Sequence, residues 1–198
     1  MFNCLKGRKE EMKTILYFSY GSNMSSRRLL ERAPSATFLS IATLKEHRLQ
    51  FHKKSKDGSG KCDAVHTANR DDCVMGVVFA MSASDKKELD QKECLGFGYE
   101  EKTVTVLLEN GDRIEASTYW TPQVSTLTGH KLRLRGGIKK NAVETDAALN
   151  PYSWYKEHVL RGARENNLPH DYISIIEKIK SLPDPDMDRH EQELAIYT

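Results

Sequence analysis

The sequence has no long hydrophobic run and no large excess of charge of either sign. None of its apolar stretches approaches the roughly 20 residues that a membrane-spanning helix needs, so we expect no contact with a membrane. Lysine and arginine total 30 residues against 28 aspartates and glutamates, and the net charge of +2 gives no strong field that would favour nucleic acid. What remains is a chain of 198 residues, 38% of them hydrophobic, which suits one globular domain with a sizeable core.

Cysteine and histidine are too scattered to indicate a metal or redox site. The four cysteines, at positions 4, 62, 73 and 94, form no Cys-x-x-Cys pair, so neither a zinc ribbon nor a redox dithiol is supported. The seven histidines include no His-x-x-x-His pair, and we expect no bound metal. Residues 1–13 are polar, lack the apolar centre of a signal peptide and are expected to form a loose tail. Single cysteines in such a chain indicate a reducing compartment, so we predict a cytoplasmic location.

An apolar run near the start of the chain stops abruptly at Gly21-Ser22-Asn23. Residues 14–20 are rich in β-branched and aromatic side chains and predict a strand, whereas residues 25–32 have helical composition. Gly21 permits a positive φ or the close approach of a ligand. Free backbone N–H groups at a helix start can hold a carboxylate or a phosphate. The same composition also serves simply to turn the chain and cap a helix, so both interpretations stay open.

The rest of the chain predicts strands in succession, with helices before and after them. Strands are expected over residues 36–44, 48–53, 64–68, 74–81, 102–108 and 113–121. Helices are expected over residues 85–93 with Ser84 as N-cap, from Asn150-Pro151 onward, and over residues 171–180. Because the strands do not alternate with helices, we predict an α+β fold with a mixed, partly closed β-barrel-like sheet and flanking helices. Residues 14–182 form the expected single domain, and residues 183–198 a C-terminal tail.

Residues 121–150 are polar, irregular and rich in positive charge. Five basic residues surround Gly136-Gly137 in this segment. One interpretation is a basic patch or lid that contacts an anion. We favour a solvated surface loop, because the charge is spread out and aromatic residues are absent from the basic stretch.

Several motifs follow one another in a characteristic order. Tyr20-Gly21-Ser22-Asn23 comes after the first strand, and Leu89-Asp90-Gln91-Lys92-Glu93 ends a helix that follows an apolar strand. Tyr99 opens the next strand, and the C-terminal part holds Tyr155 and Gly162-Ala163-Arg164-Glu165-Asn166-Asn167-Leu168-Pro169, followed by Tyr172. This ordered set resembles the γ-glutamylcyclotransferase family over residues 15–182.

The resemblance implies a γ-glutamylcyclotransferase-like fold and a lyase that acts on small γ-glutamyl substrates. In that family the α-amine of the substrate attacks its own γ-carbonyl, the ring closes to 5-oxoproline, and the amine half leaves. No cofactor takes part. Close relatives form homodimers, so a homodimer is also implied. The residues that match the family's site are Glu93 as the catalytic carboxylate and, for substrate binding, Tyr20, Gly21, Ser22, Asn23, Tyr99 and Tyr155.

The chemistry of the reaction agrees with a single carboxylate. An α-amine has a pKa of about 8, so at neutral pH it is mostly an ammonium ion and cannot attack until a base removes a proton. The same base can return a proton to the departing amine. The attack is intramolecular, so closing a five-membered ring supplies proximity without a metal. Composition alone would make Glu93 a solvated residue at a helix end, and only the resemblance assigns it a catalytic role.

Three activities remain open within this resemblance. Asn23 favours cleavage of γ-glutamyl amino acids, since glutathione-specific relatives usually carry leucine there. The alternatives are a γ-glutamylamine cyclotransferase and a binding or signalling module without enzymatic activity on the same fold. Relatives commonly have glycine after the catalytic glutamate, whereas this chain has Cys94.

Overall fold

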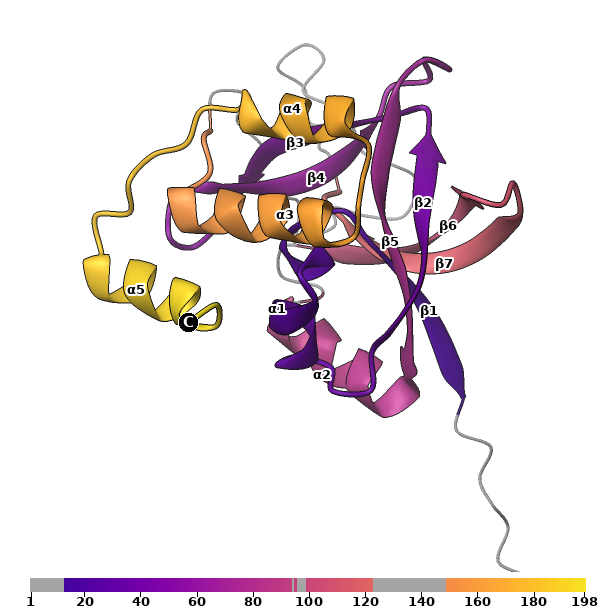
Figure 1. Ribbon diagram of the computed structural model, residues 1–198, viewed down its shortest axis with the longest axis horizontal. Coiled ribbons are helices and arrows are strands. Elements are labelled where there is room, and N and C mark those ends of the chain that lie inside the picture. Colours follow the sequence, from indigo (N-terminus) through magenta and orange to yellow (C-terminus); the bar gives the residue numbers. More distant parts are fainter. Residues whose placement is uncertain (1–12, 94, 96–98, 123–148) are drawn as a thin grey trace, which may run out of the picture.

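The computed structural model describes residues 13–93, 95, 99–122 and 149–198. Within these residues the chain forms seven strands, five α-helices and one short 3-10 helix (Figure 1). The strands are β1 (Thr14–Ser19), β2 (Thr37–Lys45), β3 (His47–Lys54), β4 (Gly60–His66), β5 (Cys73–Ser82), β6 (Glu100–Leu108) and β7 (Arg113–Trp120). The helices are η1 (Ser22–Met24), α1 (Ser26–Leu30), α2 (Ala83–Lys92), α3 (Ser153–Glu165), α4 (His170–Glu177) and α5 (Met187–Ala195).

Five of the strands close into a barrel in the order β1-β5-β2-β6-β7. All neighbours pair antiparallel except β1 and β7, which run parallel at Tyr17 and Ser117 and complete the closure. Strands β3 and β4 form a separate two-stranded antiparallel sheet. The expected α+β fold with a mixed, barrel-like sheet is therefore confirmed, and the barrel is closed.

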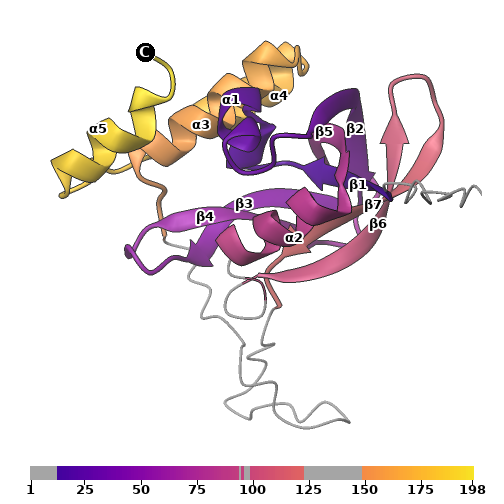
Figure 2. The ribbon, with the colours of Figure 1, turned by 90° about the horizontal axis from the view of Figure 1, so that it is seen from below.

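The core of the barrel follows from its apolar strands. β5 is apolar almost throughout, and Val74, Val77 and Val78 on it are fully buried. β1 ends in buried residues, and the three residues of η1 that follow are buried as well. Helices α3, α4 and α5 lie to one side of the sheets in both views (Figures 1 and 2). α3 packs directly on η1, and this contact places the first turn after β1.

Several element boundaries differ from those expected, and three of the differences concern where an element starts near the site. The second helix begins at Ala83 rather than residue 85, because Ser82 is its N-cap and its hydroxyl accepts a hydrogen bond from the Asp85 N–H at 3.2 Å. The helix expected from Asn150 begins at Ser153, with Tyr152 as N-cap. Strand β4 starts at Gly60, four residues before the expected start at residue 64.

Residues 183–198 were expected to form a C-terminal tail. The structure corrects this expectation, because the segment contains helix α5. Asp186 caps the helix by accepting a hydrogen bond from the Arg189 N–H at 3.0 Å. Asp184 is buried, accepts a hydrogen bond from the Trp154 indole at 2.7 Å, and forms an ion pair with Arg189. Glu193 pairs with Arg28 of α1 at 2.5 Å. Polar contacts therefore hold this segment against the domain.

Other expectations lie outside the described residues. These are the expected N-terminal tail, of which only Lys13 is described, and the basic segment 121–150, of which only residues 121–122 and 149–150 are described. Among the described cysteines, Cys62 and Cys73 are free thiols, and the cytoplasmic location stays a prediction. No helix in the described ranges is both long enough and apolar enough to cross a bilayer.

We expect acid to loosen α5 before it unfolds the barrel. The hydrogen bonds from Arg189 hold the pKa of Asp184 well below its usual range. Burial alone would raise the pKa of Glu193, but the hydrogen bond from His158 and the charge of Arg28 outweigh it and lower the pKa to about 2. Both carboxyls have a lower pKa than in the unfolded chain. Their contribution to stability is therefore complete above about pH 4.5 and is lost as the pH falls towards about 2.

Hydrogen exchange of α5 amides between about pH 5 and pH 2 measures this loss. Asp184→Asn should destabilise the protein near neutral pH by about 1–3 kcal/mol and flatten the acid dependence, because Arg189 then keeps only its longer ion pair with Asp186 at 3.7 Å. Asp188→Asn is the matched control, since Asp188 is an exposed residue on the same helix. If Asp184→Asn shows the same acid dependence as the wild type, the proposed anchoring of α5 is wrong.

Candidate active site

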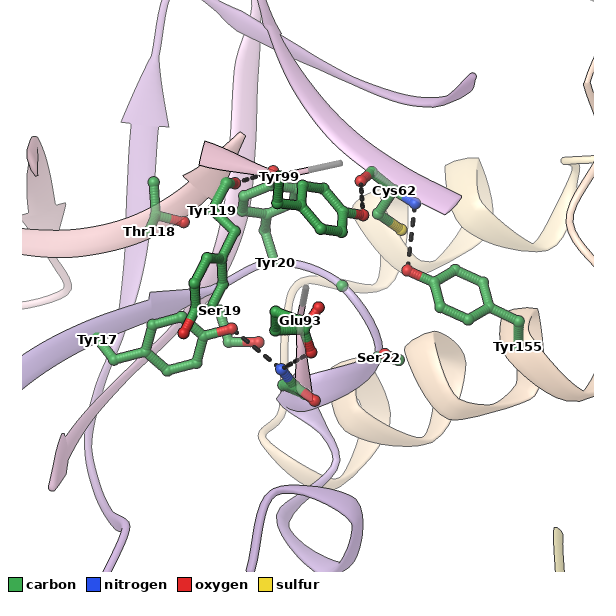
Figure 3. Close-up of a pocket in the computed structure, with 12 residues that line it drawn as sticks. Tyr17, Ser19, Tyr20, Ser22, Cys62, Glu93, Tyr99, Thr118, Tyr119 and Tyr155 are labelled. Carbon is green, nitrogen blue, oxygen red and sulfur yellow. Dashed lines mark hydrogen bonds between the residues drawn. The ribbon is translucent and has the colours of Figure 1, made fainter. Parts of the chain in front are cut away.

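A pocket opens where β1 runs into η1. It spans about 310 Å³ of space that includes open solvent, and its enclosed part is only about 30 Å³. β1, β4, β7, α3 and the end of α2 supply its walls (Figure 3). Its lining residues are Tyr17, Ser19, Tyr20, Gly21, Ser22, Asn23, Cys62, Glu93, Tyr99, Thr118, Tyr119 and Tyr155. All seven residues assigned to the site from the sequence are among them, although their roles stay predictions.

The turn after β1 forms the floor of this pocket. The Met24 N–H donates to the Gly21 carbonyl at 3.0 Å, and the Ser25 N–H donates to the Ser22 carbonyl at 3.3 Å. These two bonds close the 3-10 turn and leave the N–H groups of residues 21–23 at its start. Within the described part of the chain, no acceptor is assigned to those three N–H groups. The turn therefore offers donors to a ligand.

Gly21 does not adopt the positive φ that its sequence context allows. Its φ is −121° and its ψ is −145°. A Cβ at this position would lie 3.2 Å from Cys62 Cβ and 3.4 Å from the Tyr155 hydroxyl. Close packing against β4 and α3, rather than the sharpness of the turn, therefore favours glycine here.

Glu93 lies in the middle of the pocket, between Tyr17 and Tyr155 (Figure 3). It follows directly on α2, and its side chain is only 15% exposed. Its Oε1 accepts hydrogen bonds from Asn23 Nδ2 at 2.9 Å and from Arg32 Nη1 at 2.7 Å. Among the residues that the structure describes, no donor is bonded to Oε2. Glu93 is therefore not a solvated helix-end residue, and its second oxygen has no hydrogen-bond partner among the described residues.

The tyrosines of the site are neutral phenols that tie strands together. The Tyr20 hydroxyl donates to the Tyr119 carbonyl at 2.5 Å, and the Tyr99 hydroxyl donates to the Cys62 carbonyl at 2.7 Å. The Tyr155 hydroxyl accepts a hydrogen bond from the Cys62 N–H at 3.2 Å. Burial raises the pKa of Tyr20, Tyr99 and Tyr155 well above its ordinary value, so none of them supplies charge. Their rings wall the pocket, the hydroxyls of Tyr99 and Tyr155 hold β4, and the hydroxyl of Tyr20 holds β7.

Cys62 contributes a buried thiol to the same wall. Burial raises the pKa of this thiol to about 12. A thiol that stays protonated is a poor nucleophile, so Cys62 acts here as a small apolar side chain whose backbone is held by two tyrosines.

The Gly162–Pro169 motif supports the turn from behind. A Cβ on Gly162 would lie 2.4 Å from Ser25 N, so only glycine lets α3 come this close to η1. Asn166 Nδ2 donates to the Met24 carbonyl at 3.0 Å and to the Gly162 carbonyl at 2.7 Å. The Glu165 carboxylate accepts a hydrogen bond from the Ser26 N–H. The motif thus holds the turn that carries Asn23 in position.

Sequence reasoning missed Arg32 and several wall residues. Arg32 lies 61 residues before Glu93, in a segment where nothing marks it among neighbouring arginines. Tyr17 and Ser19 could have been found, because alternate residues of a strand share one face. The Tyr17 hydroxyl accepts a hydrogen bond from Asn23 Nδ2 at 3.2 Å, which helps to orient that amide. In the described ranges, no group of three His, Cys, Asp or Glu side chains is placed to hold a metal ion.

The fold and the site together define a small closed-barrel protein in which one largely buried carboxylate lies beside a turn whose N–H groups have no assigned acceptor in the described part of the chain. The sequence profile of the AIG2-like family matches residues 73–176. Mouse γ-glutamylcyclotransferase is 31% identical over 87% of this chain and 81% of its own length. The bovine protein is 29% identical over 90% of this chain and 86% of its own. A solved γ-glutamyl cyclotransferase structure superposes with a TM-score of 0.70 at 25% identity, covering 91% of this chain and 99% of the other.

The chain belongs to the AIG2-like, γ-glutamylcyclotransferase family. The resemblance seen in the sequence is thereby confirmed, and the matched relatives extend over nearly the whole chain.

Proposed function

We propose that the protein cleaves γ-glutamyl amino acids into 5-oxoproline and a free amino acid. The observation that carries this proposal is the placement of Glu93. Its carboxylate is fixed by Asn23 and Arg32 in a pocket whose floor presents N–H groups that have no acceptor within the described ranges. An oriented base opposite a donor-rich turn is what an intramolecular aminolysis needs. The names of the relatives, which are γ-glutamylcyclotransferases, point to the same reaction.

In this mechanism the glutamyl half of the substrate occupies the pocket. The N–H groups of residues 21–23 hold either its α-carboxylate or the oxyanion that develops on the γ-carbonyl. Oε2 of Glu93 takes a proton from the α-ammonium group, and the freed amine attacks the γ-carbonyl carbon. The new C–N bond closes the lactam ring, and the original amide C–N bond breaks.

The proton balance explains why one carboxylate is enough. The α-ammonium loses two protons as it becomes the lactam N–H, and the departing nitrogen gains two as it becomes an ammonium group. Glu93 can carry these protons from one nitrogen to the other, and no water is consumed. Asn23 and Arg32 both bind Oε1, so they act as positioning residues that keep Oε2 directed at the substrate.

The direct test is to measure 5-oxoproline release by the purified protein. We expect γ-glutamyl-alanine to be cleaved with a kcat/KM at least about ten-fold above that for glutathione or for a γ-glutamyl alkylamine. A preference for the alkylamine would indicate the γ-glutamylamine activity instead. No release from any of the three substrates would leave a binding module on the same fold and overturn the proposal.

A further inference from the structure

Helix α5 and the residues after it contact the chain directly behind the active-site turn. α5 packs on α3 and lies next to it in both views (Figures 1 and 2). The Glu193 carboxylate accepts a hydrogen bond from Arg28 of α1 at 2.5 Å. The Tyr197 hydroxyl, two residues after α5, donates to Ser25 Oγ at 2.9 Å. Both contacts reach the short stretch of chain that follows η1.

Ser25 is the junction between η1 and α1, because it is both the C-cap of η1 and the N-cap of α1. A serine at an N-cap ordinarily accepts a hydrogen bond from an N–H group of its own helix. The buried Ser25 side chain forms no such bond, and its oxygen accepts the proton of Tyr197 instead. Ser25 therefore fastens the junction to the residues after α5 rather than capping α1.

His158 of α3 holds the Tyr197 hydroxyl in the orientation that this contact needs. His158 is fully buried, and its Nδ1 lies 2.7 Å from Tyr197 Oη. Burial lowers the pKa of His158 and outweighs the nearby Glu193 carboxylate, so the ring is neutral near pH 7. Its Nε2 lies 3.1 Å from Arg28 Nη1, which can only donate and has a hydrogen for each of its two partners. We therefore assign the ring proton to Nδ1, which donates to Tyr197 and leaves the phenol proton for Ser25.

The junction at Ser25 lies between the two residues that fix Glu93. Asn23 comes two residues before it, on η1, and Arg32 comes seven residues after it, beyond the end of α1. Both donate to Oε1 of Glu93, at 2.9 Å and 2.7 Å respectively. A displacement of the junction therefore moves both partners of the carboxylate together.

We propose that Tyr197 is a positioning residue of the active site, which acts through Ser25 on the two partners of Glu93. This inference rests on the proposed function, in which Oε2 of Glu93 moves protons on the substrate. Tyr197 does not line the active-site pocket, so it has no direct part in the chemistry. Its hydroxyl ties the junction to α3 through His158, and the carboxylate thereby keeps one orientation. Without this tie the junction moves more freely, and Glu93 is directed at the substrate amine for less of the time.

Tyr197→Phe tests this role, because it removes the hydroxyl and keeps the ring. We expect kcat for γ-glutamyl-alanine to fall about five-fold while KM changes less than about two-fold, since the orientation of the base affects the chemical step. The measurement is 5-oxoproline release well below the unfolding transition, where a merely structural role would leave kcat unchanged. Tyr172→Phe is the matched control, because it removes a tyrosine hydroxyl on α4 from a buried residue that does not line the active-site pocket. It should keep the wild-type kcat.

A double variant shows whether the effect passes through Ser25. Ser25→Ala removes the acceptor of the same hydrogen bond and should also lower kcat about five-fold. If the two side chains act through this bond, Tyr197→Phe/Ser25→Ala should lose no more than about five-fold in total. A loss of about 25-fold, the product of the two single effects, would show that the residues act separately and would overturn the proposed route.

The outcomes separate this inference from the proposed function. A Tyr197→Phe variant that releases 5-oxoproline with the wild-type kcat would overturn the positioning role and leave the proposed function intact. If the wild type releases none, the proposed function fails, and hydrogen exchange then measures the tie without turnover. Tyr197→Phe should speed the exchange of amides in residues 25–30 about five-fold, whereas Tyr172→Phe should not. Equal exchange in the wild type and Tyr197→Phe would overturn the inference as well.

Discussion

Glu93→Gln should give a folded protein that has lost almost all turnover. The amide has the same shape as the carboxylate, and its oxygen can still accept hydrogen bonds from Asn23 and Arg32. Its nitrogen would take the place of Oε2 and cannot accept a proton from the substrate amine. Loss of a general base costs roughly 10²- to 10⁴-fold in rate, which corresponds to about 3–5 kcal/mol of barrier.

The measurement is 5-oxoproline formation under saturating substrate, because the loss should fall on kcat rather than on KM. Thermal unfolding should show a change of only about 1 kcal/mol, since the lost ion pair with Arg32 is partly exposed. Glu88→Gln is the matched control, because Glu88 is an exposed glutamate on α2. A Glu93→Gln variant that releases 5-oxoproline at the wild-type rate would remove Glu93 as the base.

The fold class could be predicted from the sequence because most of its strands have clear local sequence signals. β5 is an unbroken apolar run, and Asn110-Gly111 marks the tight connection between β6 and β7. Strands that come mostly in succession and do not alternate with helices favour a mixed sheet over a parallel one. Which strands pair is a long-range property, however. The parallel contact of β1 with β7 that closes the barrel joins residues 100 positions apart, and no local pattern encodes it.

Helix α5 escaped prediction for a related reason. None of its residues is buried, and only Met187, Leu194 and Ala195 among its nine residues are apolar. A short, mostly charged segment of this kind gives a weak sequence signal for a docked helix. Charged and polar groups hold it instead, through Glu193 with Arg28 and through Asp184 with Trp154. The partners of these groups lie on distant elements. A segment anchored in this way has the composition of a solvated tail until its partners are known.

The candidate site was accessible only in part. Local composition identified the turn at residues 21–23 but left its role open, and the family resemblance selected Glu93 and the tyrosines. The structure shows these residues lining one pocket. Arg32 could not be found, because its contact with Glu93 depends on how α1 and α2 pack. The Gly162–Pro169 motif entered the sequence analysis only as part of the family resemblance. The structure gives a physical reason for these residues, because they support the turn after β1.

The close contact of α3 with η1 leads to a prediction for Gly162→Ala. The expected change in stability has the opposite sign to the usual one. In a helix interior, replacing glycine by alanine ordinarily stabilises a protein by about 1 kcal/mol. Here the added Cβ would lie 2.4 Å from Ser25 N and 2.5 Å from Met24 C, both backbone atoms. These atoms cannot rotate away, so α3 and η1 must separate. Overpacking of this kind costs about 1–3 kcal/mol, and we expect the variant to be destabilised by about that amount.

The same displacement should reach the active site. Moving η1 away from α3 shifts Asn23, and with it the hydrogen bond that orients Glu93, so kcat/KM should fall by at least about ten-fold. Thermal unfolding should show a Tm lower by about 2–12 °C. Arg164→Ala, an exposed position on the same helix, is the control for helix propensity and should change both quantities little. A Gly162→Ala variant with a raised Tm and unchanged activity would show that α3 does not set the position of the turn.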